Sequence, residues 1–213
     1  MLGTNPLTIG FPTDEEFPFI IDCATSITQR GKLEYYARIG KQTPEGMVVG
    51  RDGQALTNTE EILKQLNTHE AALAPLGGIG EELAGYKGYG YATVVEVLSA
   101  ALQQGQFLSA LTGMGANGEK VPYHLGHFFI AIDTQAFLGL DAFKKTAGDI
   151  MRELRASQKA PGHDHIFTAG EKEWNVWLDR KDSGVPINEA VQGELSKVRD
   201  DLGLTKYEFP WEK

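Results

Sequence analysis

The first half of the chain alternates short apolar runs with segments whose apolar residues recur at helical spacing. Leu7–Phe11 and Phe17–Asp22 predict two strands joined by a turn-rich connection. Residues 25–41 carry apolar positions at near-helical spacing, and Val48–Leu56 predicts a hairpin around an Asp-Gly turn. Thr57 stands three residues before a glutamate, which predicts the capping box of a further helix.

The second half is dominated by helical patterns. From Gly90 onward apolar side chains recur every three to four positions, and Gly105 stands where the end of a helix is expected. His127–Asp133 is apolar without alternation, which predicts a buried strand, and His165–Gly170 is a shorter strand candidate. Asp141 is expected to cap the next helix, and two more helices are predicted over 171–184 and 187–203. The expected apolar faces are Phe143, Ala147, Ile150 and Leu154 in the helix after Asp141, and Val191, Leu195, Val198 and Leu202 in the last helix.

Strands and helices alternate along the chain, so the predicted fold class is α/β. Hairpins and glycine-rich loops interrupt the alternation, which makes it too irregular for a doubly wound sheet. The chain has 213 residues, enough for one large domain or two small ones with a real core. No apolar stretch approaches the ~20 residues that cross a bilayer, so no membrane partner is expected.

Net charge indicates the kind of binding partner, and cysteine content indicates the cellular compartment. A net charge of −9 repels phosphate backbones, so a nucleic-acid partner is not expected, whereas a small molecule or another subunit is. Cys23 is the single cysteine, which excludes an internal disulfide and suits a reducing cytoplasm. The opening ten residues lack the basic and apolar pattern of an export signal, so a cytoplasmic location is expected.

Two motifs are better explained as loops. Gly113–Gly118 matches G-x-G-x-x-G, but it follows a helical region and opens onto a polar loop instead of joining a strand to a helix. His163–His165 offers two metal ligands around an aspartate, whereas zinc needs three or four and Cys23 is far away in sequence. We therefore predict no metal site. His124 and His127 lead into a predicted strand and receive no catalytic role.

The stretch Gly85–Gly90 carries the strongest local signal. It places Lys87 among glycines directly ahead of a predicted helix. One interpretation is an anion site, because free N–H groups and the helix dipole favour negative charge at a helix N-terminus. The other is a tight turn of the chain with a solvated lysine. Spacing alone does not decide between them.

Several stretches, taken in order, resemble the malate/L-lactate dehydrogenase family, which is unrelated to the Rossmann-fold lactate and malate dehydrogenases. They are Leu2–Leu7, Phe19–Ser26, Pro75–Gly90, Gly126–Asp133 and Thr168–Trp174. The resemblance runs over essentially the whole chain. It implies a non-Rossmann α/β fold with a mixed sheet and flanking helices. It also implies an NAD(P)-dependent oxidoreductase that interconverts 2-hydroxy and 2-keto acids of malate or lactate type.

The resemblance further implies that three stretches contact NAD or NADP. The residues are Pro18, Phe19, Ile20, Ile21, Asp22, Cys23 and Ala24 in the first, Tyr86 and Lys87 in the second, and Gly170, Glu171 and Lys172 in the third. Residues 1–140 would then be a cofactor-binding α/β region, packed as one unit with a mainly helical region over 141–213. The sequence does not choose between NAD and NADP.

The family pattern continues upstream of the Leu2–Leu7 motif, and this has a consequence for catalysis. The histidine that acts as acid and base, and the arginine that holds the substrate carboxylate, are expected upstream of Met1, so no catalytic residue is assigned here. Family members imply a homodimer, and a separate N-terminal polypeptide is a further expected partner. The alternative function is a non-catalytic scaffold or assembly subunit that retains the fold.

Overall fold

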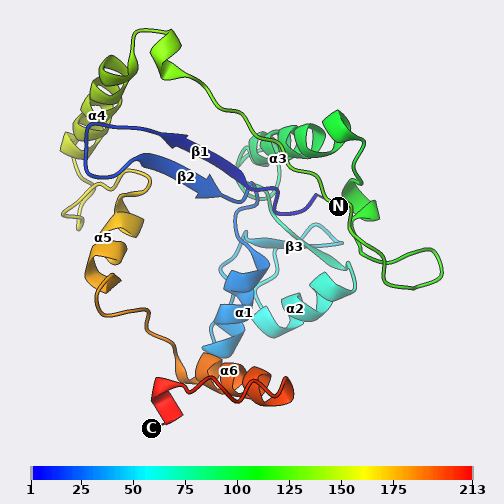
Figure 1. Cartoon of the computed structure of the whole chain (residues 1–213). Helices are drawn as coiled ribbons and strands as arrows, with labels where there is room; N and C mark the ends of the chain where they lie inside the picture. The colour runs from blue at the N-terminus through cyan, green and yellow to red at the C-terminus, as the bar shows by residue number, and fades with distance from the viewer. Residues whose placement is uncertain (1, 213) are drawn as a thin grey trace.

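The computed structural model describes residues 2–212 and shows an α/β chain whose elements gather around two short antiparallel ribbons (Figure 1). In the first ribbon β1 (Leu7–Phe11) pairs with β2 (Phe19–Cys23), with Ile9 opposite Ile21. Both predicted strands are confirmed. The second begins two residues later than expected because the carbonyl of Phe17 belongs to the connection, where it accepts a hydrogen bond of 2.7 Å from the Thr13 hydroxyl.

The second ribbon carries the best-packed core. It consists of β3 (Val48–Gly50) and β4 (Ala71–Leu73), and the helices α1 (Arg30–Arg38) and α2 (Thr59–Asn67) cover it. Buried apolar side chains from both helices and from β3 meet there: Leu33, Tyr36, Val48 and Ile62. Because they come from elements spread over more than thirty positions of sequence, this unit closes around its own hydrophobic centre.

Two local predictions in this unit are corrected in detail. The Asp52-Gly53 turn forms, with Gly53 at φ +80°, but the main partner of β3 is β4. The N-cap of α2 is Asn58, whose side chain accepts from the Glu61 N–H at 3.0 Å. Thr57, the expected cap, instead accepts a backbone hydrogen bond from Thr43 and so belongs to the preceding connection.

Four further helices complete the described part of the chain, three of them around the first ribbon and the last beside α1, where Glu194 pairs with Arg38 (Figure 1). They are α3 (Gly85–Ala100), α4 (Leu140–Ala156), α5 (Glu171–Arg180) and α6 (Glu189–Asp201), with short 3₁₀ turns at Ala101–Gln103, Leu108–Ala110, Thr134–Ala136 and Pro210–Glu212. Figure 1 shows α4 and α5 near the connection end of the β1–β2 ribbon and α3 near its other end. None of the helices between residues 2 and 212 combines the length and apolarity needed to span a lipid bilayer.

The predicted helix ends and faces are only partly right. The helix expected from Gly90 begins five residues earlier, at Gly85, and the left-handed residue after its end is Gln104, with φ +54°, in place of Gly105. Asp141 lies in the first turn of α4, whose N-cap is Gly139. The residues that α4 buries are Gly148 and Met151, whereas Ile150 and Leu154 stay more than half exposed. In α6, Leu195, Val198 and Leu202 of the expected stripe are exposed, Val191 is half-buried, and no residue of that helix is fully buried.

Two predicted strands are absent from the described residues. His165–Gly170 is an irregular segment before α5, and His127–Asp133 has no strand partner. Phe129 in the latter segment is 87% exposed and Ile132 is 69% exposed. An unbroken apolar run predicts burial between two layers, but residues 2–212 supply no strand beside it. Within residues 2–212 the strands pair as two separate antiparallel ribbons and not as the mixed sheet that the resemblance implied.

Candidate functional site

Two of the three stretches predicted to bind coenzyme lie against each other. The N–H of Ile20 in β2 donates to the carbonyl of Ala169 at 3.2 Å, which attaches the segment before α5 to the strand. Gly170 follows with φ +94°, a left-handed conformation that glycine adopts without strain. A Cβ at this position would lie 2.8 Å from the carbonyl oxygen of Pro18. The tertiary structure therefore brings Pro18–Ala24 and Gly170–Lys172 together, although they are about 150 positions apart in the sequence.

The side chains of Glu171 and Lys172 differ in what they can offer to a ligand. Glu171 is buried, and its carboxylate accepts from the backbone and hydroxyl of Thr168 and from His165. Burial alone raises the pKa of Glu171, but the hydrogen bonds from Thr168 and His165 and the charge of Arg155 outweigh it and leave that pKa below its usual range. Lys172 is exposed, with its ammonium 4.9 Å from the centre of the Phe167 ring.

The packing of residues 76–80 against the start of α3 explains the glycines around Lys87. The N–H groups of Gly85, Lys87 and Gly88 donate to the carbonyls of Gly80, Ala84 and Leu76, respectively. A Cβ on Gly85 would overlap the carbonyl oxygen of Gly78, and a Cβ on Gly88 would overlap the backbone of Leu76. These glycines therefore allow residues 76–80 to pack onto the helix. Because those N–H groups already have backbone partners, they are not available to an anion.

Lys87 itself remains able to bind a negatively charged group. It forms no ion pair within residues 2–212, and its ammonium lies 5.9 Å from the centre of the Tyr86 ring. Tyr86 is 59% exposed and lines a cavity of about 450 Å³ under the glycine-rich loop. The side chain of Lys87, and not the helix N-terminus, is thus the part of this motif that could neutralise a phosphate.

The second stretch is connected to the others through a short chain of backbone hydrogen bonds. Thr25, two residues beyond β2, accepts from the N–H of Leu76 at 2.9 Å, and Leu76 accepts from Gly88 at 3.2 Å. Gly170 lies at the start of β2 and Lys87 beyond its end. Backbone hydrogen bonds therefore connect the strand β2 with the start of α3, where Lys87 lies, through Leu76.

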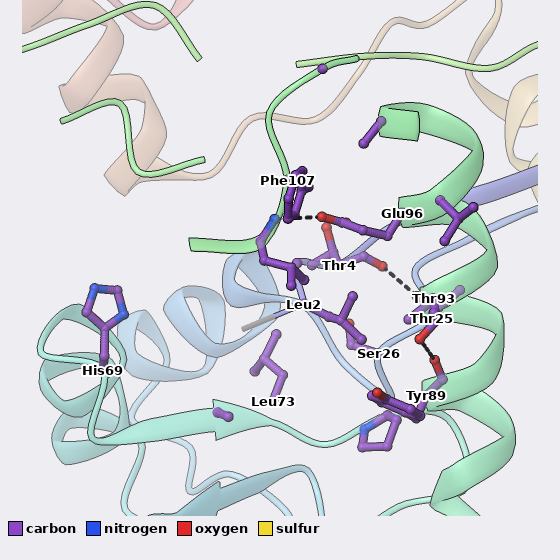
Figure 2. Close-up of a pocket in the computed structure, with 18 of the residues that line it drawn as sticks. Leu2, Thr4, Thr25, Ser26, His69, Leu73, Tyr89, Thr93, Glu96 and Phe107 are labelled. Carbon is purple, nitrogen blue, oxygen red and sulfur yellow. Dashed lines mark hydrogen bonds between the residues drawn. The ribbon is translucent and has the colours of Figure 1, made fainter. Parts of the chain in front are cut away.

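A larger cavity, of about 1030 Å³, lies beside this region but is built from other residues (Figure 2). Its lining is mostly apolar and comes from the chain around Thr4 and Thr25, from β4, from one face of α3 and from residues 104–108. Tyr89 of α3 lines both cavities. Neither cavity is lined by any residue of Pro18–Ala24 or Gly170–Lys172.

Sequence reasoning missed the polar residues that join the elements around the larger cavity. Asn5 donates to the carbonyl of Ala92 at 3.0 Å and to the carboxylate of Glu96 at 2.8 Å, which ties the chain before β1 to α3. Glu96 also accepts from the N–H of Leu108. The Thr-Asn-Pro run could have indicated the special position of Asn5, because asparagine tolerates a left-handed backbone. In the structure Asn5 has φ +39°.

The glycine motif Gly113–Gly118 forms a turn and does not join a strand to a helix. Gly118 has φ +82° and donates to the carbonyl of Gly115, so Gly113–Gly118 forms a turn between the isolated bridge partners Met114 and Lys120. His165 contacts Glu171 at 2.7 Å. Among residues 2–212 no three histidine, cysteine, aspartate or glutamate side chains come together as metal ligands would.

The pairing of the strands distinguishes this fold from the Rossmann class of dinucleotide-binding proteins. Within the described part of the chain every ribbon is antiparallel, so no parallel strand–helix–strand unit is present to bind a dinucleotide in the Rossmann manner. The structure is thus an α/β protein outside the doubly wound class. The family model described as malate/L-lactate dehydrogenase matches residues 1–196, and the chain belongs to that family.

Individual relatives agree with this assignment. The chain is 37% identical over 204 residues to malate dehydrogenase from Pyrococcus horikoshii, covering 96% of this chain and 54% of the relative. It is 32% identical over 207 residues to L-sulfolactate dehydrogenase from Methanocaldococcus jannaschii, covering 96% and 54%. The crystal structure of malate dehydrogenase from Entamoeba histolytica superposes with a TM-score of 0.88 at 36% identity, covering 96% and 55%. The chain spans about half the length of the relatives it matches.

Proposed function

We propose that this chain is the coenzyme-binding portion of an NAD- or NADP-dependent dehydrogenase that acts on 2-hydroxy acids of malate or lactate type. The observation that carries the proposal is the match to the family over residues 1–196, together with a fold similar to that of a malate dehydrogenase. When bound, the coenzyme would donate or accept a hydride at C2 of the substrate, and a proton would join or leave the substrate oxygen.

The residues of this chain would bind and orient the coenzyme. Lys87 offers a positive side chain to a phosphate, and the junction of β2 with Gly170 offers a backbone surface that a side chain at that glycine would block. The proton donor and the carboxylate anchor of the substrate are assigned to the part of the family pattern outside the match. Removing such groups from a dehydrogenase costs several powers of ten in rate, so the chain by itself is expected to bind coenzyme with little or no turnover.

Binding of coenzyme provides the test. We expect the fluorescence of NADH or NADPH to change on titration with the chain. We expect Lys87→Ala to raise the dissociation constant about tenfold, equivalent to about 1.4 kcal/mol, because one charge-assisted contact is lost. Lys181→Ala is the matched control, since Lys181 is also exposed and also lies over one aromatic ring, that of Trp177. Absence of a signal with both coenzymes favours the alternative, a scaffold subunit. Equal effects of the two variants would show that Lys87 has no special role.

A partner is proposed on the evidence of the exposed segment His127–Asp133. This segment exposes large apolar side chains and has no strand partner within residues 2–212. An apolar segment with unpaired backbone groups is stabilised when it pairs with a further strand. We assign the pairing strand to a separate N-terminal polypeptide equivalent to the part of the relatives outside the match, or to a second copy in a homodimer. The single Cys23 supports a cytoplasmic location.

The exposed segment makes a prediction about stability. Phe129→Ser is expected to change the free energy of unfolding of the isolated chain by less than about 0.5 kcal/mol and to reduce its self-association, because the side chain is 87% exposed. The control Met151→Ser, at a position 2% exposed, is expected to cost at least about 2 kcal/mol. Chemical denaturation and analytical ultracentrifugation measure the two effects. A large loss of stability in Phe129→Ser would mean that the isolated chain buries this segment.

A further inference from the structure

Residues of the chain contact both carboxylate oxygens of Glu171. One oxygen lies 2.7 Å from Nε2 of His165. The other accepts from the N–H of Thr168 at 3.0 Å and from its hydroxyl at 3.1 Å, and it lies 3.6 Å from the guanidinium of Arg155. The side chain is only 10% exposed. Three hydrogen bonds and one ion pair to groups of the chain favour a structural role for this carboxylate over contact with a bound molecule.

Thr168 and Glu171 are joined by two backbone N–H donors, because each residue donates its N–H to an oxygen of the other. The N–H of Glu171 donates to the carbonyl of Thr168 at 3.1 Å, while the Thr168 N–H donates back to the Glu171 carboxylate. This resembles a capping box, in which a first-turn glutamate reaches back to a backbone N–H before the helix. Between them lie Ala169 and Gly170, the two residues that contact β2. The carboxylate therefore determines how those two residues are presented to the strand.

A second set of contacts holds the same turn from the other side. Arg155, on α4, donates to Glu15 in the β1–β2 connection and to the hydroxyl of Thr168, and it lies 5.8 Å from the centre of the Phe17 ring. Phe17 stacks on Trp174 of α5, with 6.4 Å between ring centres. The turn before α5, the end of α4 and the entry to β2 are thus joined through two ion pairs and one aromatic stack.

We infer that Glu171 is a positioning residue for the coenzyme site. It does not contact the coenzyme; it holds Ala169 and Gly170 against β2 and so sets the spacing between two of the three binding stretches. This changes the role that the family resemblance implied for Glu171, and it rests on the proposed function because the spacing matters only if coenzyme binds there.

Two variants at this position and one control test the inference. Glu171→Ala removes every acceptor, and we expect it to raise the dissociation constant for NADH or NADPH about tenfold, because displaced groups bind their ligand poorly. Glu171→Gln keeps one oxygen acceptor, and we expect a smaller increase, which amounts to partial rescue. Glu173→Ala removes an exposed glutamate from the same first turn of α5, and we expect no change. Amide hydrogen exchange in the peptide covering residues 18–24 reports whether Ile20 still donates to Ala169.

We expect faster amide exchange at residues 18–24 together with weaker coenzyme binding. Both effects should be largest in Glu171→Ala, smaller in Glu171→Gln and absent in Glu173→Ala. Faster exchange with an unchanged dissociation constant would overturn the inference, since Glu171 would then serve stability alone. Weaker binding with unchanged exchange would also overturn it, since Glu171 would then contact the coenzyme directly. Failure of the unmodified chain to bind either coenzyme would overturn the proposed function, and the role for coenzyme spacing would fall with it.

Discussion

Replacing Gly88 with alanine is expected to lower the free energy of unfolding by about 3 kcal/mol. An added Cβ would overlap the carbonyl oxygen and amide nitrogen of Leu76 and lie 2.8 Å from its Cα. These are backbone atoms, which cannot rotate away as the end of a flexible side chain can. Leu76 is also fixed on both sides, because it donates to Thr25 and accepts from Gly88. Urea denaturation followed by circular dichroism measures the loss.

Gly90→Ala is the matched control for this prediction. Gly90 lies in the same helix, two positions further on, and a Cβ there would meet no atom within 4 Å. Alanine has the higher helix propensity, so this variant is expected to gain up to about 1 kcal/mol. If both variants had the same stability, the packing of residues 76–80 against α3 would be disproved, and with it the explanation for the glycines around Lys87.

Replacing Arg155 with methionine is expected to cost about 3 kcal/mol, because breaking a buried ion pair leaves charge without compensation. The side chain of Arg155 is 17% exposed and lies between Glu15, 13% exposed, and Glu171, 10% exposed. Methionine retains part of the apolar stem that packs near Phe17 but supplies no positive charge. Differential scanning calorimetry at neutral pH measures the loss, and the same experiment at lower pH tests its cause.

The loss in free energy of unfolding caused by Arg155→Met is expected to become smaller at lower pH. In the unmodified chain the pKa of Glu171 is lowered from its ordinary value of 4.5. A lowered pKa means that the ionised carboxylate stabilises the fold above that ordinary value, and that this contribution disappears as the pH falls through the lowered pKa. In Arg155→Met the ionised Glu171 carboxylate stabilises the fold less, because its positive partner is gone. The stability of this variant therefore depends less on pH. As the pH falls, the difference in free energy of unfolding between the two proteins becomes smaller.

Arg152→Met provides the comparison for Arg155. Arg152 lies one turn earlier on α4 and contacts Asp14, Glu15 and Asp149, but its side chain is 43% exposed. Exposed ion pairs contribute little because water screens them. We expect a much smaller loss than for Arg155, with little dependence on pH. Losses of equal size would show that the lower exposure of Arg155, between Glu15 and Glu171, does not increase its contribution to stability.

Local sequence signals predicted elements well where one residue type dictates one conformation. The turn at Asp52-Gly53 forms because glycine accepts positive φ, and the strands around Ile9 and Ile21 form from apolar runs bounded by turn residues. Boundaries were less reliable. Thr57 and Asn58 are both good caps, and the choice between them depended on a hydrogen bond to Thr43, which no local pattern reveals.

Patterns that imply burial were the least reliable, because burial depends on what the rest of the molecule provides. The run around Phe129 has the composition of an inner strand, yet no neighbouring strand exists among residues 2–212. On α4, the expected face included Ile150, but the side that packs is centred on Gly148, where a side chain would meet the carboxylate of Asp14. The partner of the helix, and not its periodicity, selected the buried side.

The candidate site shows the same division. By its motifs alone the sequence determined the family and the residue types available: a lysine among glycines, a Gly-Glu-Lys run and an apolar strand ending in Asp-Cys-Ala. Only the tertiary structure decided how each is used. It joined Gly170 to β2, turned Glu171 inward, and gave the N–H groups around Lys87 to the chain's own backbone. The reason is that these roles depend on hydrogen bonds and close contacts between residues distant in sequence, which spacing along the chain does not encode.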